Sequence, residues 1–171
     1  AAPLNAGSSQ YFTIPALTFP TAGNYSICVN ADANYNVVET NENNTLCRGV
    51  SVLPACADLT AGVFSLNGSY QQCQPAGFSF SVNNVGGLSS GASTFARLVI
   101  KQGGVIEAIY NNVVPNLGAQ SSTTFSYNHS FSNSGGYELV FSVDTTNVIS
   151  ECSESNNMVV AYTSANTCVY K

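Results

Sequence analysis

The sequence has no tryptophan, one histidine, one methionine and little charge, and these shortages exclude several kinds of function. Four Lys and Arg residues stand against nine Asp and Glu, a net charge of -5, so the chain lacks the basic surface that binds nucleic acid or anionic membranes. The single histidine, His129, cannot complete a zinc site with cysteines that show no CxxC spacing. We therefore expect no nucleic acid partner and no zinc.

Long apolar runs and helical periodicity are also missing. No stretch of eighteen apolar residues occurs, so we expect no segment that spans a membrane. The N-terminal AAPLNAGSS has neither the basic nor the apolar region of a signal peptide. We interpret the chain as a processed or excised extracellular piece. No Gly-rich loop opens a helix, so phosphate binding by that route is not expected.

What the sequence has in quantity is the composition of an antiparallel β protein. Ser and Thr together number 35 and Asn 20. Apolar and polar residues alternate in short runs bounded by Gly, Asn, Ser or Pro, as in FSFSVNN at 78–84 and YELVFSV at 137–143. Such runs indicate half-buried strands between turns. Their spacing of about ten residues predicts an immunoglobulin-like antiparallel β-sandwich.

One acidic, Asn-rich segment occurs twice at an offset of 112 residues. NYSICVNADANYNVVETNENN at 24–44 runs in step with GYELVFSVDTTNVISECSESNN at 136–157, apart from one skipped residue before the final Asn pair. The matched residues are Tyr25 and Tyr137, Asp32 and Asp144, Glu39 and Glu151, and Glu42 and Glu154. Self-similarity at a fixed offset indicates tandem copies of one structural unit.

The second copy of this unit has about sixty more residues in front of it than the first. We therefore predict a partial repeat over residues 1–53 and a complete seven-stranded immunoglobulin-like domain over residues 54–171. The strands expected in the complete domain are 58–65, 77–84, 94–101, 104–110, 121–131, 136–144 and 157–164. The partial repeat should hold only the counterparts of the last three strands, at 9–19, 24–31 and 44–52. Three strands cannot bury both inner faces of a sandwich, so we expect another chain or a missing half to cover them.

Six cysteines without metal-ligand spacing predict disulfides and therefore an oxidising, extracellular compartment. Fifteen pairings are open to six cysteines, and the expected strand order narrows them. The pairs that we predict are Cys28–Cys47, Cys56–Cys152 and Cys73–Cys168. Sequons for N-glycosylation occur at Asn24, Asn43, Asn67 and Asn128, about as many as chance gives with this composition.

Six of the nine acidic residues lie in the two copies of the repeated segment: Asp32, Glu39, Glu42, Asp144, Glu151 and Glu154. Carboxylates that crowd near one turn repel each other unless something compensates. Calcium could compensate, since it binds carboxylate and amide oxygens in loops. The alternative is that these side chains cap the turn by accepting backbone N–H bonds. Turn capping is the commoner use of such residues, and recurrence in both copies fits either interpretation.

The second copy resembles the CARDB family, cell-adhesion-related domains of bacterial and archaeal surface proteins. The resemblance rests on GYELVFSVD at 136–144 with ECSESNN at 151–157, on ADLTAGVFS at 57–65, and on FSFSVNNVGGLSSGASTFARLVI at 78–100. It covers residues 57–164 as a whole domain and 3–52 as a half domain. It implies an immunoglobulin-like sandwich, often in tandem on adhesive or S-layer proteins, without catalysis. The six cysteines depart from the family pattern.

These observations predict an extracellular structural or adhesive protein, a subunit or fragment of a surface filament, adhesin or S-layer, which assembles with neighbouring subunits. The alternative is a carbohydrate-binding accessory module of a secreted enzyme that contacts surface polysaccharide, although such a module should show a row of exposed aromatic residues. A secreted hydrolase is a third class. For that class neither His129 nor the carboxylates Glu107 and Glu138 are placed by sequence spacing in a catalytic arrangement. We expect no enzyme activity and no cofactor other than calcium.

Overall fold

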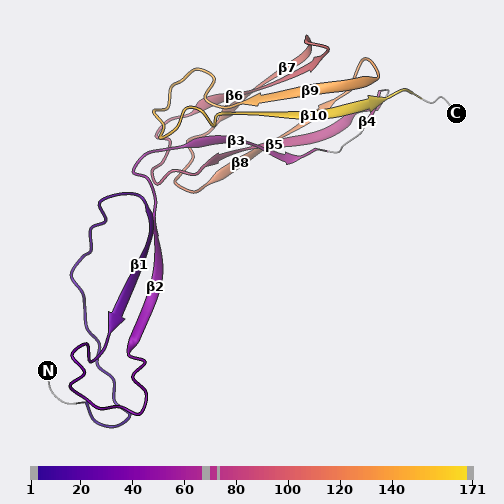
Figure 1. Cartoon of the computed structure of the whole chain (residues 1–171). Coiled ribbons are helices and arrows are strands. Elements are labelled where there is room, and N and C mark those ends of the chain that lie inside the picture. Colours follow the sequence, from indigo (N-terminus) through magenta and orange to yellow (C-terminus); the bar gives the residue numbers. More distant parts are fainter. Residues whose placement is uncertain (1–3, 67–69, 73, 169–171) are drawn as a thin grey trace. The chain divides into compact units, whose positions relative to one another are not determined.

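The computed structural model describes residues 4–66, 70–72 and 74–168, and these form two compact units, Ala1–Val52 and Leu53–Lys171 (Figure 1). Throughout the described residues the regular structure is β, with no helix. The prediction of an all-β sandwich is therefore confirmed.

The unit Ala1–Val52 contains one antiparallel hairpin, β1 (Gly23–Asn30) and β2 (Thr45–Val52). Cys28 and Cys47 face each other in its register, with Cα atoms 4.0 Å apart, and form a disulfide. None of the described residues in this unit is buried. The hairpin is therefore held by its backbone ladder and its disulfide, without an apolar core of its own.

The expected strand at 9–19 is wrong. The chain there forms no strand, and Tyr11 and Phe12 are 95% and 75% exposed. The counterpart of this segment in the second copy is β8 (Ser122–His129), whose only strand partner among the described residues is β5 (Ala76–Asn84). Among the described residues no counterpart of β5 lies beside 9–19, so this segment has no strand partner there, and Pro15 supplies no N–H. β1 and β2 form because they pair with each other.

The unit Leu53–Lys171 is a sandwich of two sheets. The five-stranded sheet has the order β4 (Tyr70–Gln71), β10 (Met158–Asn166), β9 (Gly135–Ser142), β6 (Thr94–Gln102) and β7 (Val105–Val114). The three-stranded sheet has the order β3 (Leu59–Ser65), β5 and β8. β4, a two-residue strand parallel to β10, was not predicted, because two residues carry no alternation. The other seven strands correspond to those that the sequence predicts.

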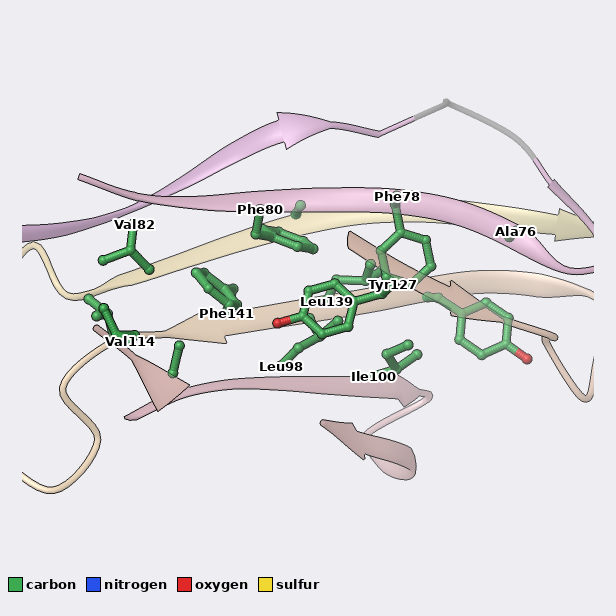
Figure 2. Packing of buried hydrophobic residues seen from close by; sticks show 14 of the residues in the cluster. Ala76, Phe78, Phe80, Val82, Leu98, Ile100, Val114, Tyr127, Leu139 and Phe141 are labelled. Carbon is green, nitrogen blue, oxygen red and sulfur yellow. The ribbon is translucent and has the colours of Figure 1, made fainter. Parts of the chain in front are cut away.

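The core fills the space between the two sheets, as Figure 2 shows. Phe80 of β5 stacks on Phe141 of β9 with ring centroids 5.0 Å apart, and both side chains are fully buried. The strands β5, β6 and β9 contribute every second residue, such as Leu98 and Ile100 of β6, because side chains alternate between the faces of a sheet. Burial of one such side chain contributes about 1.5–3 kcal/mol. This core makes the sandwich a rigid support for the loops at its ends.

Candidate functional site

The loop between β9 and β10, residues 143–157, carries the second copy of the acidic motif. Asp144 opens it with a positive φ of 46° and is 5% exposed. Its carboxylate accepts the backbone N–H groups of Val148 and Ile149, each at 3.0 Å, and the Thr94 hydroxyl of β6. Glu154 accepts the N–H of Glu151 at 3.2 Å. The acidic side chains thus organise the loop from within.

The first copy repeats this loop with the same hydrogen bonds. Asp32, with φ 47°, accepts the N–H groups of Asn36 and Val37, each at 2.9 Å. Glu42 accepts the N–H of Glu39 at 3.0 Å, as Glu154 does for Glu151. Because the first copy lacks the sandwich, the loop geometry follows from the local sequence. These bonds are those that the turn-capping interpretation requires.

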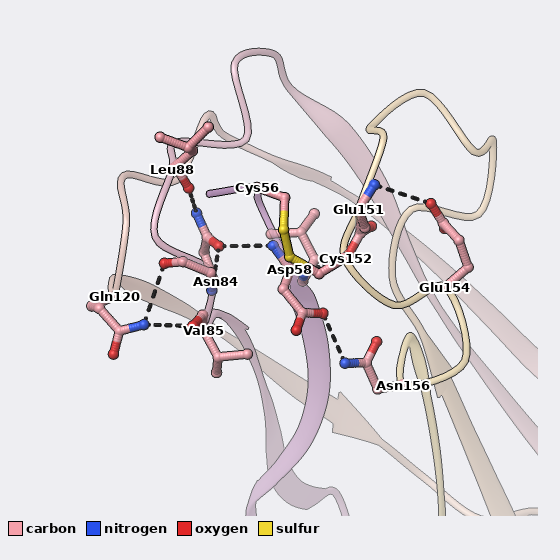
Figure 3. The surroundings of a disulfide bond; sticks show 12 residues. Cys56, Asp58, Asn84, Val85, Leu88, Gln120, Glu151, Cys152, Glu154 and Asn156 are labelled. Carbon is pink, nitrogen blue, oxygen red and sulfur yellow. Dashed lines mark hydrogen bonds between the residues drawn. A yellow bond between two sulfur atoms is a disulfide. The ribbon is translucent and has the colours of Figure 1, made fainter. Parts of the chain in front are cut away.

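The loop of the second copy is fastened to the start of the unit Leu53–Lys171 by a disulfide and hydrogen bonds (Figure 3). Cys152 forms a disulfide with Cys56, with Cα atoms 5.7 Å apart, and its N–H donates to the Ala57 carbonyl at 2.9 Å. Glu151 accepts the N–H of Leu59, the first residue of β3. Three contacts therefore join segments almost a hundred residues apart in the chain.

A buried asparagine holds the neighbouring turn at the same end of the sandwich (Figure 3). Asn84 is 1% exposed, and its Oδ1 accepts the N–H groups of Asp58 and Gly86, each at 3.1 Å. Its Nδ2 donates to the carbonyls of Leu88, Leu117 and Gly118. A Cβ on Gly86 would lie 2.2 Å from the Cys56 carbonyl oxygen, so this turn needs glycine. Asn84 and Gly86 lie in the segment 78–100 on which the family resemblance rests, but the sequence did not show which groups Asn84 would bond.

The carboxylates of the second loop also lie close enough together to hold one cation. Among the described residues, Asp144, Glu151 and Glu154 form the one group of three or more such side chains whose ligand atoms lie within 4.8 Å of one another. Burial raises the pKa of the Glu151 carboxyl; the Leu59 N–H and Asn157 amide lower it, and the nearby carboxylates raise it. The net shift is upward, so the loop holds its negative charge at a cost. The first copy has no such group, although its residues Asp32, Glu39 and Glu42 are all described: their carboxylate oxygens do not all lie within 4.8 Å of one another.

The predicted glycosylation sites and the third predicted disulfide lie at the surface or involve residues outside those that the structure describes. Asn24, Asn43 and Asn128 are exposed, whereas Asn67 lies outside the described residues. Cys168 is disulfide-bonded, and Cys73, with which we paired it, lies outside the described residues.

His129 belongs to a half-buried network that the sequence did not predict. Its Nε2 lies 2.7 Å from the Glu107 Oε1, and its Nδ1 lies 3.0 Å from the Tyr110 hydroxyl. The other oxygen of Glu107 accepts the Tyr137 hydroxyl at 3.0 Å. The network links β7 to β8 across one side of the sandwich. Its members lie on three strands, so no spacing in the sequence could bring them together. Glu138 is bound elsewhere, in an ion pair with Lys101.

A family model supports the second unit's identity. The CARDB model matches residues 56–161, more than half of the chain. The chain belongs to the CARDB family. The resemblance inferred from the sequence for residues 57–164 is therefore confirmed, and the unit Leu53–Lys171 is a CARDB domain, a member of a family of non-catalytic surface domains.

Solved structures of CARDB domains share this fold. A crystal structure of a CARDB domain from Pyrococcus furiosus, in complex with di-metal ions, is 22% identical, covers 64% of this chain and 94% of its own, and has a TM-score of 0.55. A solution structure of that domain gives 21% identity, coverage of 64% and 95%, and a TM-score of 0.54. No curated protein matches the chain. Within the described residues we find no helix long and apolar enough to cross a bilayer.

Proposed function

We propose that this protein is a structural or adhesive component outside the cell, which assembles with neighbouring protein chains through contacts between β-structures. The proposal rests on the CARDB family and above all on one observation in the unit Ala1–Val52. Its described residues include large apolar side chains that are more than half exposed: Leu4, Tyr11, Phe12, Ile14, Leu17, Val29, Tyr35, Val37, Val38 and Leu46. Exposed apolar surface of this extent marks an interaction surface.

The two edges of the β1–β2 hairpin support the same proposal. Within the part of the chain that the structure describes, each strand has one neighbour, so each presents one row of backbone groups unpaired in the sheet. An isolated two-stranded hairpin is marginal in water. The counterpart strands β9 and β10 obtain their stability from the core, which the first copy lacks. A neighbouring chain, or the other half of a longer protein, would supply that missing surface.

The test is sedimentation of residues 1–171 over a range of concentrations, combined with amide hydrogen exchange over residues 9–52. We expect the mass to rise above that of the monomer, and protection of 9–52 to rise with it, because assembly covers the exposed apolar side chains. A monomer in which 9–19 is protected at every concentration would contradict the proposal.

The carbohydrate-binding alternative has less support. The large aromatic side chains exposed on the described part of the CARDB domain are Phe95 on β6 and Tyr162 on β10. They lie on different, non-adjacent strands and do not form a row. Binding of the isolated chain to a glycan array would favour this alternative over assembly.

Weak calcium binding by Asp144, Glu151 and Glu154 stays a prediction. The Pyrococcus furiosus domain is a complex with di-metal ions, and the carboxyl oxygens here are close enough for one cation. Against it, backbone N–H groups already occupy both oxygens of Asp144. Millimolar calcium should raise the melting temperature of the CARDB domain relative to EDTA, and Glu154→Gln should abolish the rise. If the melting temperature is the same with and without calcium, turn capping is the only role left for these carboxylates.

A further inference from the structure

The outer face of the five-stranded sheet, turned away from the core, carries an apolar row across four strands. The register places Ile109 of β7 beside Val99 of β6, Val99 beside Val140 of β9, and Val140 beside Val160 of β10. Ile109 and Val160 are 50% and 39% exposed. The residues on either side of Val99 and Val140 in sequence point into the core, so this row faces outward. Within the CARDB domain itself, no other layer of described residues covers it.

Charged residues lie on both sides of this apolar row. On one side, the Lys101 Nζ of β6 lies 3.2 Å from the Glu138 Oε1 of β9, and both side chains are about one third exposed. Ile106 and Tyr162, 54% and 71% exposed, flank this ion pair on β7 and β10. On the other side Arg97 of β6 hydrogen-bonds Asn111 of β7. The apolar row therefore lies between two charged rows: one holds Lys101 and Glu138, and the other holds Arg97.

We propose that this outer face binds the same face of a second copy of this chain. A twofold axis that runs along the strands, between β6 and β9, sets β6 over β9 of the second copy and β7 over β10. Each row then meets its own row. Val99 lies over Val140 of the second copy, and Ile109 lies over Val160 of the second copy. Lys101 lies over Glu138 of the second copy, and the reciprocal pair forms by symmetry.

The charges decide this orientation of the axis. A twofold axis along the rows would instead reverse each strand over itself and bring Arg97 over Lys101 of the second copy. Two like charges at an interface are repulsive and suppress that arrangement. The axis along the strands leaves Arg97 opposite Ser142 of the second copy, which is neutral. The face is therefore complementary to itself in one orientation.

The size of the face predicts a weak contact. Four strands and three rows of side chains, those of Arg97, Val99 and Lys101, cover about 19 by about 20 Å, roughly 400 Å² of flat area. Stable interfaces bury about 800 Å² of accessible surface per partner, so this contact lies at the lower end of the range. Weak pairing of this kind is useful where many copies stand close together, because one contact then adds to others. The inference rests on the proposed function and adds to it a second contact surface, on the CARDB domain, with a second copy of this chain as its partner.

The first experiment compares two lysine substitutions in the full chain by sedimentation equilibrium, from about 10 µM to about 1 mM. Val160→Lys places a charge in the apolar row and should weaken self-association roughly tenfold or more, because that charge has no partner in the contact. Val63→Lys on β3 is the matched control, since Val63 is a strand valine of similar exposure, 42%, in the other sheet. It should leave self-association unchanged, and both variants should keep the melting temperature.

The second experiment tests the pairing of charges between chains. Lys101→Glu makes the pair negative in every copy and Glu138→Lys makes it positive, so each variant alone should associate less than the unchanged chain. A mixture of the two should associate again, as a heterodimer, because the two acidic side chains of the first variant meet the two basic side chains of the second. The ion pair within one chain cannot produce this rescue.

Each outcome decides the proposal. Equal effects of Val160→Lys and Val63→Lys on self-association would overturn it. So would a mixture of Lys101→Glu and Glu138→Lys that associates no more strongly than either variant alone. Self-association that survives Val160→Lys would assign assembly to the unit Ala1–Val52; the proposed function would stand and this inference would fail. A monomer at every concentration would overturn both, and binding of that monomer to a glycan array would make the occupant of the face a sugar.

Discussion

Replacement of Asp144 by alanine should lower the unfolding free energy of the CARDB domain by about 4 kcal/mol. The buried carboxylate accepts three hydrogen bonds, from Val148, Ile149 and Thr94. Bonds to a charged group contribute about 1.5–3 kcal/mol each and are not fully additive. Alanine at the φ of 46° adds about 1 kcal/mol of strain, and the loss of repulsion from Glu151 offsets part of the total.

The assay is thermal unfolding of the full chain, followed by calorimetry and near-UV circular dichroism. For a domain of this size, about 4 kcal/mol corresponds to a fall of about 15 °C in melting temperature. Asp32→Ala is the matched control, because Asp32 opens the same loop in the unit that has no core. It should leave the transition of the CARDB domain unchanged. A loss below about 1 kcal/mol for Asp144→Ala would show that these bonds do not hold the loop.

Three further outcomes are expected. Replacement of Cys56 and Cys152 together by serine should cost about 4–5 kcal/mol, read from urea unfolding, because the disulfide closes a separation of 96 residues; an unchanged urea midpoint would contradict this. The melting temperature of Glu151→Gln, relative to that of the unchanged chain, should increase as pH rises above about 4.5. The reason is that the pKa of Glu151 is raised in the folded state, so the unchanged chain loses stability when this carboxyl ionises. A difference in melting temperature that is independent of pH would count against that reasoning. In dilute, monomeric protein, amides of 9–19 should exchange at once and the paired amides of β1 and β2 more slowly than these, and equal rates would be inconsistent with the hairpin.

The local sequence determined the strands of the sandwich and the acidic turn, because both depend on residues close together in the chain. Alternation predicted seven strands of the sandwich, because a strand with one buried face needs an apolar residue at every second position. The repeated acidic motif predicted a repeated turn, and both loops form it with the same hydrogen bonds, at Asp32 and at Asp144. That loop needs no partner strand, so its geometry survives in a unit without a core.

Only the tertiary structure decided which segments obtain a partner. Residues 9–19 run in step with β8 in the repeat, yet only β8 is a strand, because β5 lies beside it. The central role of Asn84 and the link from His129 to Glu107 arise between elements that are distant in the chain. The apolar row on the outer face likewise exists only after the register aligns β7, β6, β9 and β10. Alternation along a strand decides the face on which a side chain lies, whereas pairing of strands decides its neighbours.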